Sequence, residues 1–506
     1  MTGIAQPEVA PAEVIESALA QRLRAACGVL LDEPPPAPDP DVARDAGILL
    51  DLLVEAVRAR PSPDRVWLLY VAVSGSYPAA DALLEAIRQF QLIPVVEMTL
   101  WLLDRALDNA DRESSAHGMH IVADQVVVDV DHSARHDLHT GIQQVVRRTV
   151  PLWMREHNAL PVAWSDRRRA LRTLSAAETR RVHRDAPRQD APTATIVVVP
   201  WHTTVVLAET PPQESCARLA ALAQWSGNTV VAVGYDCIPA VSGDLVPLAE
   251  PARFGRYLTV IKHARRVAAI SESAAAEFQG FADALPAQGL RGPTVVECAL
   301  PVEASAVSDD RAQSAARPDV PLILSVGSLE PRKNHLAILY AAERLWREGL
   351  RFELLFIGGS GWGDEVPREV ARLRARGRSV STRRAVSDAE LAAAYRDARF
   401  TVFPSLHEGY GLPVAESVSL GTPVITSDYG STKEIAAGGG AVLVDPRDDD
   451  AILDAMRSLL TDDARLQALR DAIARRPVRT WQMYAAELWD CLVTPEPGAT
   501  SSATAP

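Results

Sequence analysis

PSLHEGYGLPVAESVSLGTPVITS, residues 404–427, is the stretch that decides the fold. The apolar, β-rich run 400–403 comes before it, which predicts a strand that ends just ahead of the loop. Pro413 suits the first turn of a helix and Gly421 suits the end of that helix. A strand, a glycine-containing loop and a helix in this order are typical of one unit of a parallel α/β sheet.

Two carboxylates, Glu408 and Glu416, stand eight residues apart in this stretch, with Gly409, Gly411 and Pro413 between them. A helix N-terminus presents free backbone N–H groups and the positive end of a dipole, so the loop favours an anion. Because carboxylates repel a phosphate, these two suit hydroxyl groups, one on a sugar and one on a ribose. The residues themselves thus outline a nucleotide-sugar site.

A second anion site is indicated by SVGSLEPRKNH, residues 325–335. A strand is expected to end at Val326, and Gly327 allows a close approach of the backbone. Arg332 and Lys333 then stand in a strand-to-helix loop, where cations can neutralise a diphosphate leaving group. The alternative is a plain solvated turn that starts the helix. The glutamate segment in the same region makes that alternative the minority view.

The composition excludes several classes of protein. A chain of 506 residues is too long for one core, so two or three domains are expected. A net charge of -13 argues against a nucleic-acid binder. Five cysteines without a CxxC spacing favour neither a zinc site nor disulfides. With no signal or transmembrane pattern, we expect a cytoplasmic protein, at most peripheral on the inner face of the cell membrane.

The chain divides into regions of different character. Residues 1–119 are expected to form a mainly helical N-terminal extension, with helices at 42–58, 79–90 and 95–110. Two roles stay open for this extension, packing against the rest of the chain and binding a protein partner. Residues 34–40, PPPAPDP, form a stiff linker after a short first helix.

Residues 120–317 show a βαβ rhythm, which predicts a parallel sheet with a helix at 142–152. The strands are expected at 125–130, 195–199, 229–233 and 266–270. Within this region, the run 167–188 is basic and poorly periodic. It is either a solvated insertion or a surface that attracts an anionic acceptor or a membrane.

Residues 318–480 alternate more regularly and predict a doubly wound α/β domain, whose ligands bind at the carboxyl ends of its strands. Ser387 with Glu390, and Ser431 with Glu434, match the capping box. Residues 481–495 are expected to form a last helix, and residues 496–506 a disordered tail. The expected strands are 322–326, 353–357, 401–403, 423–425 and 441–444, and the expected helices are 335–347, 387–397 and 449–460.

Taken together, these motifs resemble the family-4 retaining glycosyltransferases of GT-B fold, with their E-x7-E signature. The resemblance covers about residues 120–490 and is strongest over 321–445. GSGW at 359–362, SDAELAAAY at 387–395 and TWQMYAAEL at 480–488 agree with it. The segments VGSLEPRKNH, YDCIP and HTGIQQVVR are most similar to sequences of the mannosyltransferase branch of bacterial O-antigen and surface-polysaccharide synthesis.

The resemblance implies a GT-B fold, in which two Rossmann-like domains face a cleft and the last helix crosses back to the first of them. It also implies a retaining transfer of a hexose, with mannose from GDP-mannose as the best expectation. The acceptor would be a hydroxyl of a glycan or of a lipid-linked glycan. Enzymes of this branch use the nucleotide sugar as co-substrate and need no metal or other cofactor.

Roles on the donor side are likewise implied by the resemblance. Glu408 would contact the sugar hydroxyls and stabilise charge at the sugar ring, and Glu416 would hold the ribose. Lys333 and Arg332 would neutralise the leaving diphosphate. The remaining donor-binding residues are expected to be Gly327, Ser328, Asn334, Gly409, Tyr410, Gly411 and Leu412. Many relatives carry arginine in place of Ser328, so Arg332 would have to compensate.

The acceptor side is less well marked. The resemblance implies roles for Gly141, Asp236 and Glu272, the last of these at the end of the final strand of its domain. Tyr235 stands where many relatives have a histidine, so the constellation on this side departs from the common pattern. His202 follows a predicted strand, and loops after strands often carry function.

Three further features each have an alternative to a metal site or a catalytic role. Asp129-Val130-Asp131 has the form of a DxD metal motif but ends a predicted strand in a GT-B-like pattern. His132, His136 and His139 suggest a metal cluster, but no predicted helix fixes their spacing, so a solvated or substrate-facing loop is expected instead. For His407, fixing the loop of Glu408 and a plain structural role remain equal alternatives.

Two other functions stay open from the sequence. One is a sugar-nucleotide epimerase or a phosphorylase on the same fold. The other is a non-catalytic subunit that binds a nucleotide sugar or scaffolds an assembly through residues 1–119. Intact Glu408, Glu416 and Lys333 argue against the second.

Overall fold

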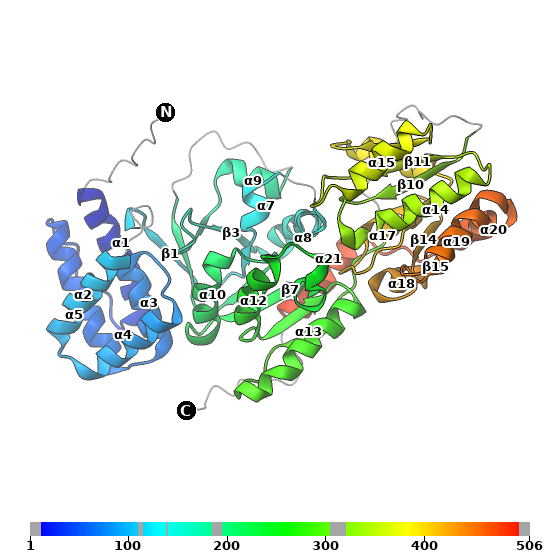
Figure 1. Ribbon diagram of the computed structural model, residues 1–506. Helices are drawn as coiled ribbons and strands as arrows, with labels where there is room; N and C mark the ends of the chain where they lie inside the picture. The colour runs from blue at the N-terminus through cyan, green and yellow to red at the C-terminus, as the bar shows by residue number, and fades with distance from the viewer. Residues whose placement is uncertain (1–11, 110–114, 138–139, 185–194, 304–319, 495–506) are drawn as a thin grey trace.

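The computed structural model describes five stretches of the chain, which form a helical region, a first α/β sheet region and a second α/β sheet region, arranged in a row (Figure 1). The described residues are 12–109, 115–137, 140–184, 195–303 and 320–494. His139, residues 185–188 of the basic run, the junction at residues 317 and 318 and the tail 496–506 lie outside the described residues.

Five helices of the described residues build the N-terminal region, and three of them agree with the prediction. They are α1 (Ala12–Leu30), α2 (Val42–Ala59), α3 (Pro63–Ser74), α4 (Ala80–Leu92) and α5 (Val95–Asn109). The first helix is 19 residues long rather than short. Helix α3 was not predicted, because its residues Val66 to Ser74 are all buried and a helix buried on every side has no amphipathic period.

The helical region shares a continuous apolar core with the first sheet. The Tyr77 ring packs between Trp67 and Trp164, with centroid distances of 5.2 and 5.9 Å, and its hydroxyl donates to the Val198 carbonyl of the sheet. The buried Arg22 guanidinium donates to the backbone carbonyls of Ala72, Ser115 and His117. The region therefore has the packing role, the first of the two roles left open by the sequence.

The first sheet contains nine strands within the described residues, in the order β1-β5-β4-β3-β2-β6-β7-β8-β9. The strands are β1 (Met119–Val122), β2 (Val127–Asp129), β3 (Leu160–Trp164), β4 (Leu171–Thr173), β5 (Val197–Pro200), β6 (Thr204–Leu207), β7 (Thr229–Gly234), β8 (Arg266–Ala269) and β9 (Thr294–Glu297). The helices are α7 (Asp131–Arg135), α8 (Gly141–His157), α9 (Ala176–Val182), α10 (Gln213–Trp225), α11 (Ile238–Val241), α12 (Glu250–Ile261) and α13 (Glu272–Ala284).

One strand departs from the predicted parallel sheet. Strand β4 runs antiparallel to both of its neighbours, β3 and β5. It lies in the basic run 167–188, which also contains α9, so this part of the run is not an unstructured insertion. The buried Leu171 anchors β4, and Arg172 pairs with Glu178 of α9 at 2.8 Å. The sequence did not predict these two short elements, because their arginine side chains give the segment the polar character of a loop.

The second sheet contains six parallel strands among the described residues, in the order β12-β11-β10-β13-β14-β15. They are β10 (Leu322–Val326), β11 (Glu353–Ile357), β12 (Val380–Arg383), β13 (Phe400–Phe403), β14 (Val424–Ser427) and β15 (Ala441–Val444). Around them lie α14 (His335–Arg347), α15 (Glu365–Ala375), α16 (Asp388–Asp397), α17 (Leu412–Ser419), α18 (Gly430–Ala436), α19 (Asp449–Thr461) and α20 (Asp463–Ile473). The strand order reverses between β10 and β13, where doubly wound sheets bind ligands.

Of the two predicted capping boxes, one is confirmed and one is wrong. Ser387 caps α16 reciprocally with Glu390. Helix α18 instead begins after Tyr429, and no side chain caps it. Ser431 lies inside the helix and donates to the Glu408 carbonyl at 2.9 Å. Glu434 accepts hydrogen bonds from the N-terminus of α13, which belongs to the first sheet region. The contact of Glu434 with α13 therefore takes the place of the predicted capping contact with Ser431.

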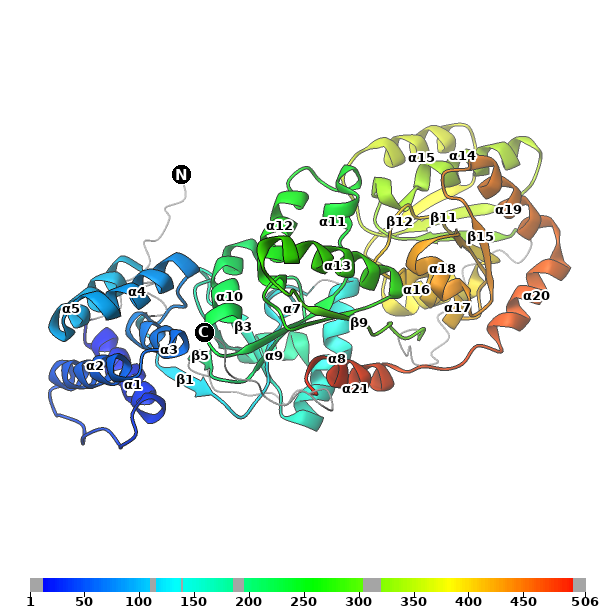
Figure 2. The ribbon, with the colours of Figure 1, turned by 90° about the horizontal axis from the view of Figure 1, so that it is seen from below.

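The last helix, α21 (Trp481–Leu492), lies beside α8 of the first sheet region, as both views show (Figures 1 and 2). The indole of Trp153 on α8 donates to the Ala485 carbonyl at 2.8 Å. The chain thus returns from the second sheet region to the first. Across the described part of the chain, no helix has both the length and the apolarity needed to cross a membrane.

Candidate functional site

The loop that carries Glu408, called the glutamate loop below, leaves β13 at the carboxyl edge of the second sheet and enters α17. Pro413 lies in the first turn of α17 and Gly421 follows its end, as predicted. Gly411 has φ +101°, a conformation that L side chains rarely adopt, so this turn requires glycine. The Ser427 and Ser431 hydroxyls donate to the carbonyls of Ser405 and Glu408. The loop is therefore held from the side of β14 and α18.

The carboxylate of Glu408 lies between two cations. Lys333 Nζ is 2.6 Å from one oxygen, and an Arg332 guanidinium nitrogen is 2.8 Å from the other. The Lys333 and Glu408 side chains are each only 10% exposed. Burial alone would raise the pKa of Glu408, but the charges of Lys333 and Arg332 outweigh it and lower the pKa to about 2. Glu408 is therefore ionised at any physiological pH.

The two cations come from the turn that follows β10. Gly327 begins this turn, and its amide donates to the Ile357 carbonyl of β11. Residues Pro331–Lys333 form a single 3-10 turn, and Asn334, at φ +56°, leads into α14. The Asn334 amide group donates to the Pro446 carbonyl at 2.6 Å. Arg332 also donates to the His407 carbonyl at 2.8 Å, which ties the turn to the glutamate loop.

A second carboxylate, that of Glu330, also forms an ion pair with Arg332, at 3.1 Å. The Ser328 hydroxyl donates to the other oxygen of Glu330 at 2.5 Å. Two cations and two carboxylates thus balance in formal charge when no ligand is bound. An incoming anion has to compete with Glu330 or Glu408 for the arginine.

Glu416, the second glutamate of the E-x7-E motif, has a different partner. It lies on α17 and accepts a hydrogen bond from the Tyr395 hydroxyl of α16 at 2.9 Å. Burial raises the pKa of Glu416 to about 7. The two glutamates therefore titrate in different ranges, because two cations offset the burial of Glu408, whereas the hydrogen bond from Tyr395 offsets the burial of Glu416 only in part.

The first sheet region faces the glutamate loop through the turn that follows β7. A Cβ atom on Gly409 would lie 2.4 Å from the Tyr235 carbonyl and 3.1 Å from the Asp236 side chain, so only glycine permits this approach. The Tyr235 hydroxyl points away and donates to the Ala208 carbonyl at 2.7 Å. Burial raises the pKa of Asp236, whose nearby charges include Arg332 and Glu408. Asp236 thus lies opposite the cation cluster.

Other contacts join the two sheet regions around this point. The Ser271 hydroxyl, just before α13, donates to the Gly409 carbonyl at 2.6 Å, and the Tyr410 hydroxyl donates to the Leu300 carbonyl at 2.7 Å. Leu412, the first residue of α17, reaches Gly141 at the start of α8. Gly141, Asp236 and the donor-side loop are therefore neighbours, although they lie far apart in the sequence.

Two of the candidates on the acceptor side lie elsewhere or face solvent. His202 lies between β5 and β6, near Gly227 at the amino end of β7, and its ring contacts Asp64 of α3 at 2.8 Å. Glu272 is exposed, and its backbone amide binds Glu434. His202 therefore joins the helical region to the sheet at the edge opposite the cation cluster.

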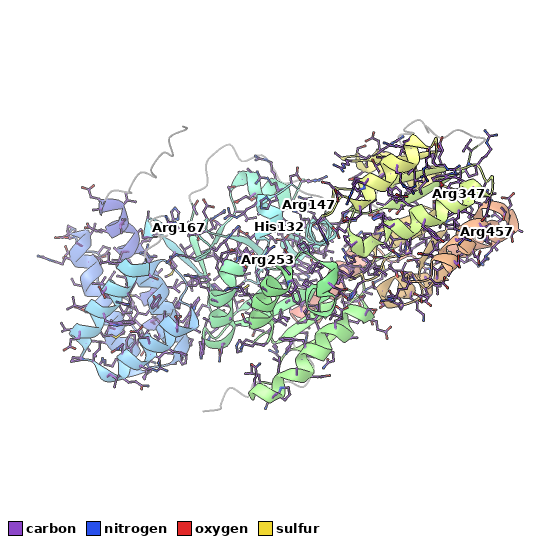
Figure 3. The ribbon with its side chains drawn as sticks, viewed as in Figure 1. His132, Arg147, Arg167, Arg253, Arg347 and Arg457 are labelled. Atoms are coloured by element: carbon purple, nitrogen blue, oxygen red, sulfur yellow. The ribbon has the colours of Figure 1, made fainter. Side chains whose placement is uncertain are left out.

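The remaining motifs have structural partners. Asp129 accepts from the Trp164 indole at 2.9 Å, and Asp131 accepts from Arg135 and Arg168. His132 is exposed near the start of α7, in the same part of the molecule as Arg147 of α8 (Figure 3). No group of three His, Cys, Asp or Glu side chains in the described stretches is placed to hold a metal ion.

A pocket of about 210 Å³ opens beside the turn that carries the two cations, between α14 and the start of α15. Asn334 lines it, and so does the buried His335, whose pKa burial lowers to about 4. The other lining residues are Leu329, Glu330, Pro331, Leu336, Trp362, Gly363, Glu365 and Val366.

Sequence reasoning missed several residues that contact this site: Ser242 and Glu277 beside His407, Glu330 beside Arg332, and Ser405 beside Glu408. Ser242 and Glu277 come from distant segments, so no local pattern marks them, whereas Glu330 and Ser405 contact neighbours within the two motif segments themselves. Tyr395 had a signal, since it closes the segment SDAELAAAY that agreed with the resemblance.

Comparison with known proteins agrees with these observations. Residues 307–476 match the family described as glycosyl transferases group 1. The chain is 35% identical over 161 residues to the O-antigen chain mannosyltransferase B of Escherichia coli, covering 31% of this chain and 42% of that protein. It is 37% identical over 130 residues to a serotype-specific mannosyltransferase WbdA of the same species, covering 25% of this chain and 16% of that protein.

Among solved structures, the sucrose-phosphate synthase of Thermosynechococcus elongatus matches with a TM-score of 0.51 and 17% identity, over 72% of this chain and 97% of that one. This likeness confirms the predicted GT-B fold. The alignments with the two curated mannosyltransferases span less than half the length of either protein.

Proposed function

We propose that this protein is a retaining glycosyltransferase that moves a mannosyl group from GDP-mannose to a hydroxyl of a glycan or lipid-linked glycan, and the match of residues 307–476 to glycosyl transferases group 1 supports the reaction class. The observation that carries the proposal is the buried Lys333–Glu408–Arg332 cluster at the switch point of the second sheet, with Asp236 facing it. The similarity to O-antigen mannosyltransferases supports mannose as the sugar.

On the donor side, Lys333 and Arg332 would bind the diphosphate. Glu408 would accept hydrogen bonds from the hydroxyl groups of the sugar. Glu416 would accept hydrogen bonds from the ribose hydroxyls. Gly327, Ser328, Asn334 and the backbone of residues 409–412 would line the same site. Buried cations in a site that excludes water stabilise developing negative charge more strongly than they could in water.

In the reaction, the bond between the sugar C1 and the diphosphate oxygen breaks and the diphosphate leaves with the bonding electron pair. The acceptor hydroxyl attacks C1 from the same face, and its proton passes to the departing diphosphate. Glu408 would stabilise the oxocarbenium-like sugar, and positioning supplies much of the acceleration. Since the two cations provide the positive charge that the leaving group needs, the proposed reaction requires no metal ion or other cofactor.

On the acceptor side, the Asp236 side chain and Gly141 both lie against the donor loop, so we propose that the acceptor hydroxyl enters between them and Glu408. A lipid-linked acceptor would bring the enzyme to the inner face of the cell membrane. The exposed arginines in residues 167–184 would favour the anionic surface of that membrane.

The test is a transfer assay on the full chain with a panel of GDP-, UDP- and dTDP-sugars and mannose-terminated acceptors. We expect GDP-mannose to be used and NMR to show retention at the anomeric carbon. A donor that changes without acceptor would indicate an epimerase and overturn the proposal. Binding of no nucleotide sugar at all would overturn it as well.

The site assignment has its own variant. Glu408→Gln removes the charge and keeps the shape, so we expect transfer to fall by at least about 100-fold and the melting temperature to fall while the fold remains. Unpaired buried cations cost about 3 kcal/mol or more, which explains the expected loss of stability. Glu369→Gln, at an exposed ion pair on α15, is the control and should leave transfer unchanged.

A further inference from the structure

Helix α13 of the first sheet region lies directly against the loop that carries Glu408. His407, the residue before Glu408, reaches across and its Nε2 contacts a carboxylate oxygen of Glu277 on α13. The other ring nitrogen of His407, Nδ1, lies 2.7 Å from the Ser242 hydroxyl. His407 and Glu277 are only 17% and 15% exposed, so the contact is largely shielded from solvent.

Glu277 has a second partner on its own side of the interface. Its other oxygen accepts a hydrogen bond from the Cys237 amide at 2.6 Å. Cys237 follows Asp236, just as His407 precedes Glu408. One carboxylate therefore holds the neighbours of both acidic residues that face each other in the candidate site.

The backbone around His407 links this contact to the cations as well. The His407 carbonyl accepts from Arg332 at 2.8 Å, and the Gly409 carbonyl accepts from Ser271, at the start of α13. A shift of Glu277 would thus move Asp236, Glu408 and Arg332 relative to one another. Such a residue controls alignment without touching a substrate.

Resting on the function proposed above, we propose that Glu277 is a positioning residue which, through His407, latches the two sheet regions together and aligns Asp236 with Glu408 for transfer. Neither residue binds the donor. The donor would be bound by residues of the second sheet region. Asp236 and Glu408 are aligned only while the contact between Glu277 and His407 is made.

The charge of His407 supports a latch that can open. Burial alone would lower the pKa of His407, but the hydrogen bond and the charge of Glu277 outweigh it and raise the pKa. Asp236 also raises it, whereas Arg332 lowers it. A neutral histidine keeps a donor for Glu277 and an acceptor for Ser242, so deprotonation weakens the contact without abolishing it.

The decisive kinetic test is a double-mutant cycle with Glu277→Ala and His407→Ala. Each single variant should lower kcat by roughly 10- to 100-fold, since small misplacements in an active site are costly. The KM for the donor should change less than about threefold, because uniform donor binding is left in place. The double variant should be no slower than the worse single one, since both changes break the same contact.

A rescue variant and a matched control sharpen the cycle. His407→Gln keeps a neutral donor that can reach Glu277, and it should restore part of the kcat lost in His407→Ala. Gln279→Ala removes a polar side chain from the exposed part of the same helix, where its partner is Asp283 of α13 itself. It should leave kcat and KM unchanged. Multiplicative losses in the double variant would overturn the proposal.

Hydrogen exchange tests the latch without any turnover. In Glu277→Ala the amides of residues 405–411 should exchange at least about tenfold faster than in the wild type, while those of α19 stay protected. Unchanged exchange in 405–411 would overturn the latch even if the enzyme is a transferase. If no donor is ever turned over, the proposed function fails, and the exchange experiment still decides whether the latch exists.

Discussion

Arg332 is held by two carboxylates, and only one of them fits the proposed chemistry. Glu408 suits the sugar, whereas Glu330 merely neutralises the guanidinium at 3.1 Å. A nucleoside diphosphate must displace Glu330 or bind beside its negative charge. In the proposed function Glu330 would therefore oppose donor binding, and its charge neutralises the buried Arg332 while no anion is bound.

Replacing Glu330 by glutamine should strengthen nucleotide binding. The variant removes one negative charge beside the diphosphate position and keeps a hydrogen-bonding group for Ser328. We expect the affinity for GDP, measured by calorimetry, to rise about three- to tenfold, the size of a partly exposed charge contact of about 1 kcal/mol. The control Glu369→Gln, at the partly exposed ion pair on α15, should show no gain. Weaker binding in Glu330→Gln would mean that Glu330 supports the donor site.

Glu416 should make nucleotide binding depend on pH. Its carboxyl has a pKa of about 7 because of burial, so it is neutral below that pH and ionised above it. Ribose hydroxyls donate more strongly to a carboxylate than to a neutral acid. The affinity for GDP should thus rise about three- to tenfold between pH 6 and pH 8, as one proton is released on binding. Glu416→Gln should flatten this profile, and an unchanged slope would contradict the assignment.

At the scale of the element, strands β10, β11, β13 and β15 and helices α14, α16 and α19 could be predicted, because apolar runs and caps mark them locally. Helix α3 could not, since it is buried all round and lacks a period. Strand β4 could not, because its arginines resemble a surface run. Within the site, the cations and glutamates follow from motifs, whereas Glu277 and Ser242 act on His407 from more than a hundred residues away.

Glu434 gives an element-scale prediction about α13. Its carboxylate accepts from the Glu272 and Ser273 amides at 3.0 and 2.8 Å, so it caps a helix of the other sheet region. Glu434→Ala should cost about 1 kcal/mol in urea unfolding, the usual size of an N-terminal cap. It should also speed hydrogen exchange at the start of α13.

The control for that experiment is another cap carboxylate. Glu390 caps α16 within its own region, so Glu390→Ala should cost a similar free energy and leave exchange in α13 unchanged. If the two variants show the same exchange in α13, Glu434 does not join the two regions in solution.

At the scale of the whole molecule, the three regions form a row but not three independent bodies (Figure 1). The helical region shares its core with the first sheet, and α21 returns from the second sheet region to α8. The sheet regions meet through α13 and the loop of Glu408. The candidate site therefore lies between a composite first body, which includes the helices, and the second sheet region.

The shared core predicts the outcome of removing the helical region. A chain that starts at residue 115 would expose Trp164 and the strand of Val198, which Tyr77 covers. Losing one large aromatic contact in a core costs about 3–5 kcal/mol, and a domain is stable by only about 5–15 kcal/mol. We expect the truncated chain to aggregate or to melt well below the full chain in circular dichroism and size-exclusion experiments.

A milder variant separates this effect from the loss of a partner site. Tyr77→Phe removes only the hydrogen bond to Val198 and should cost about 1 kcal/mol, while Tyr340→Phe on the surface of α14 should cost close to nothing. A dispensable partner-binding module would behave differently, since the truncated chain would then be monomeric and melt like the full chain. That result would contradict the shared core, because the apolar face of the first sheet would have to be stable in water without its helices.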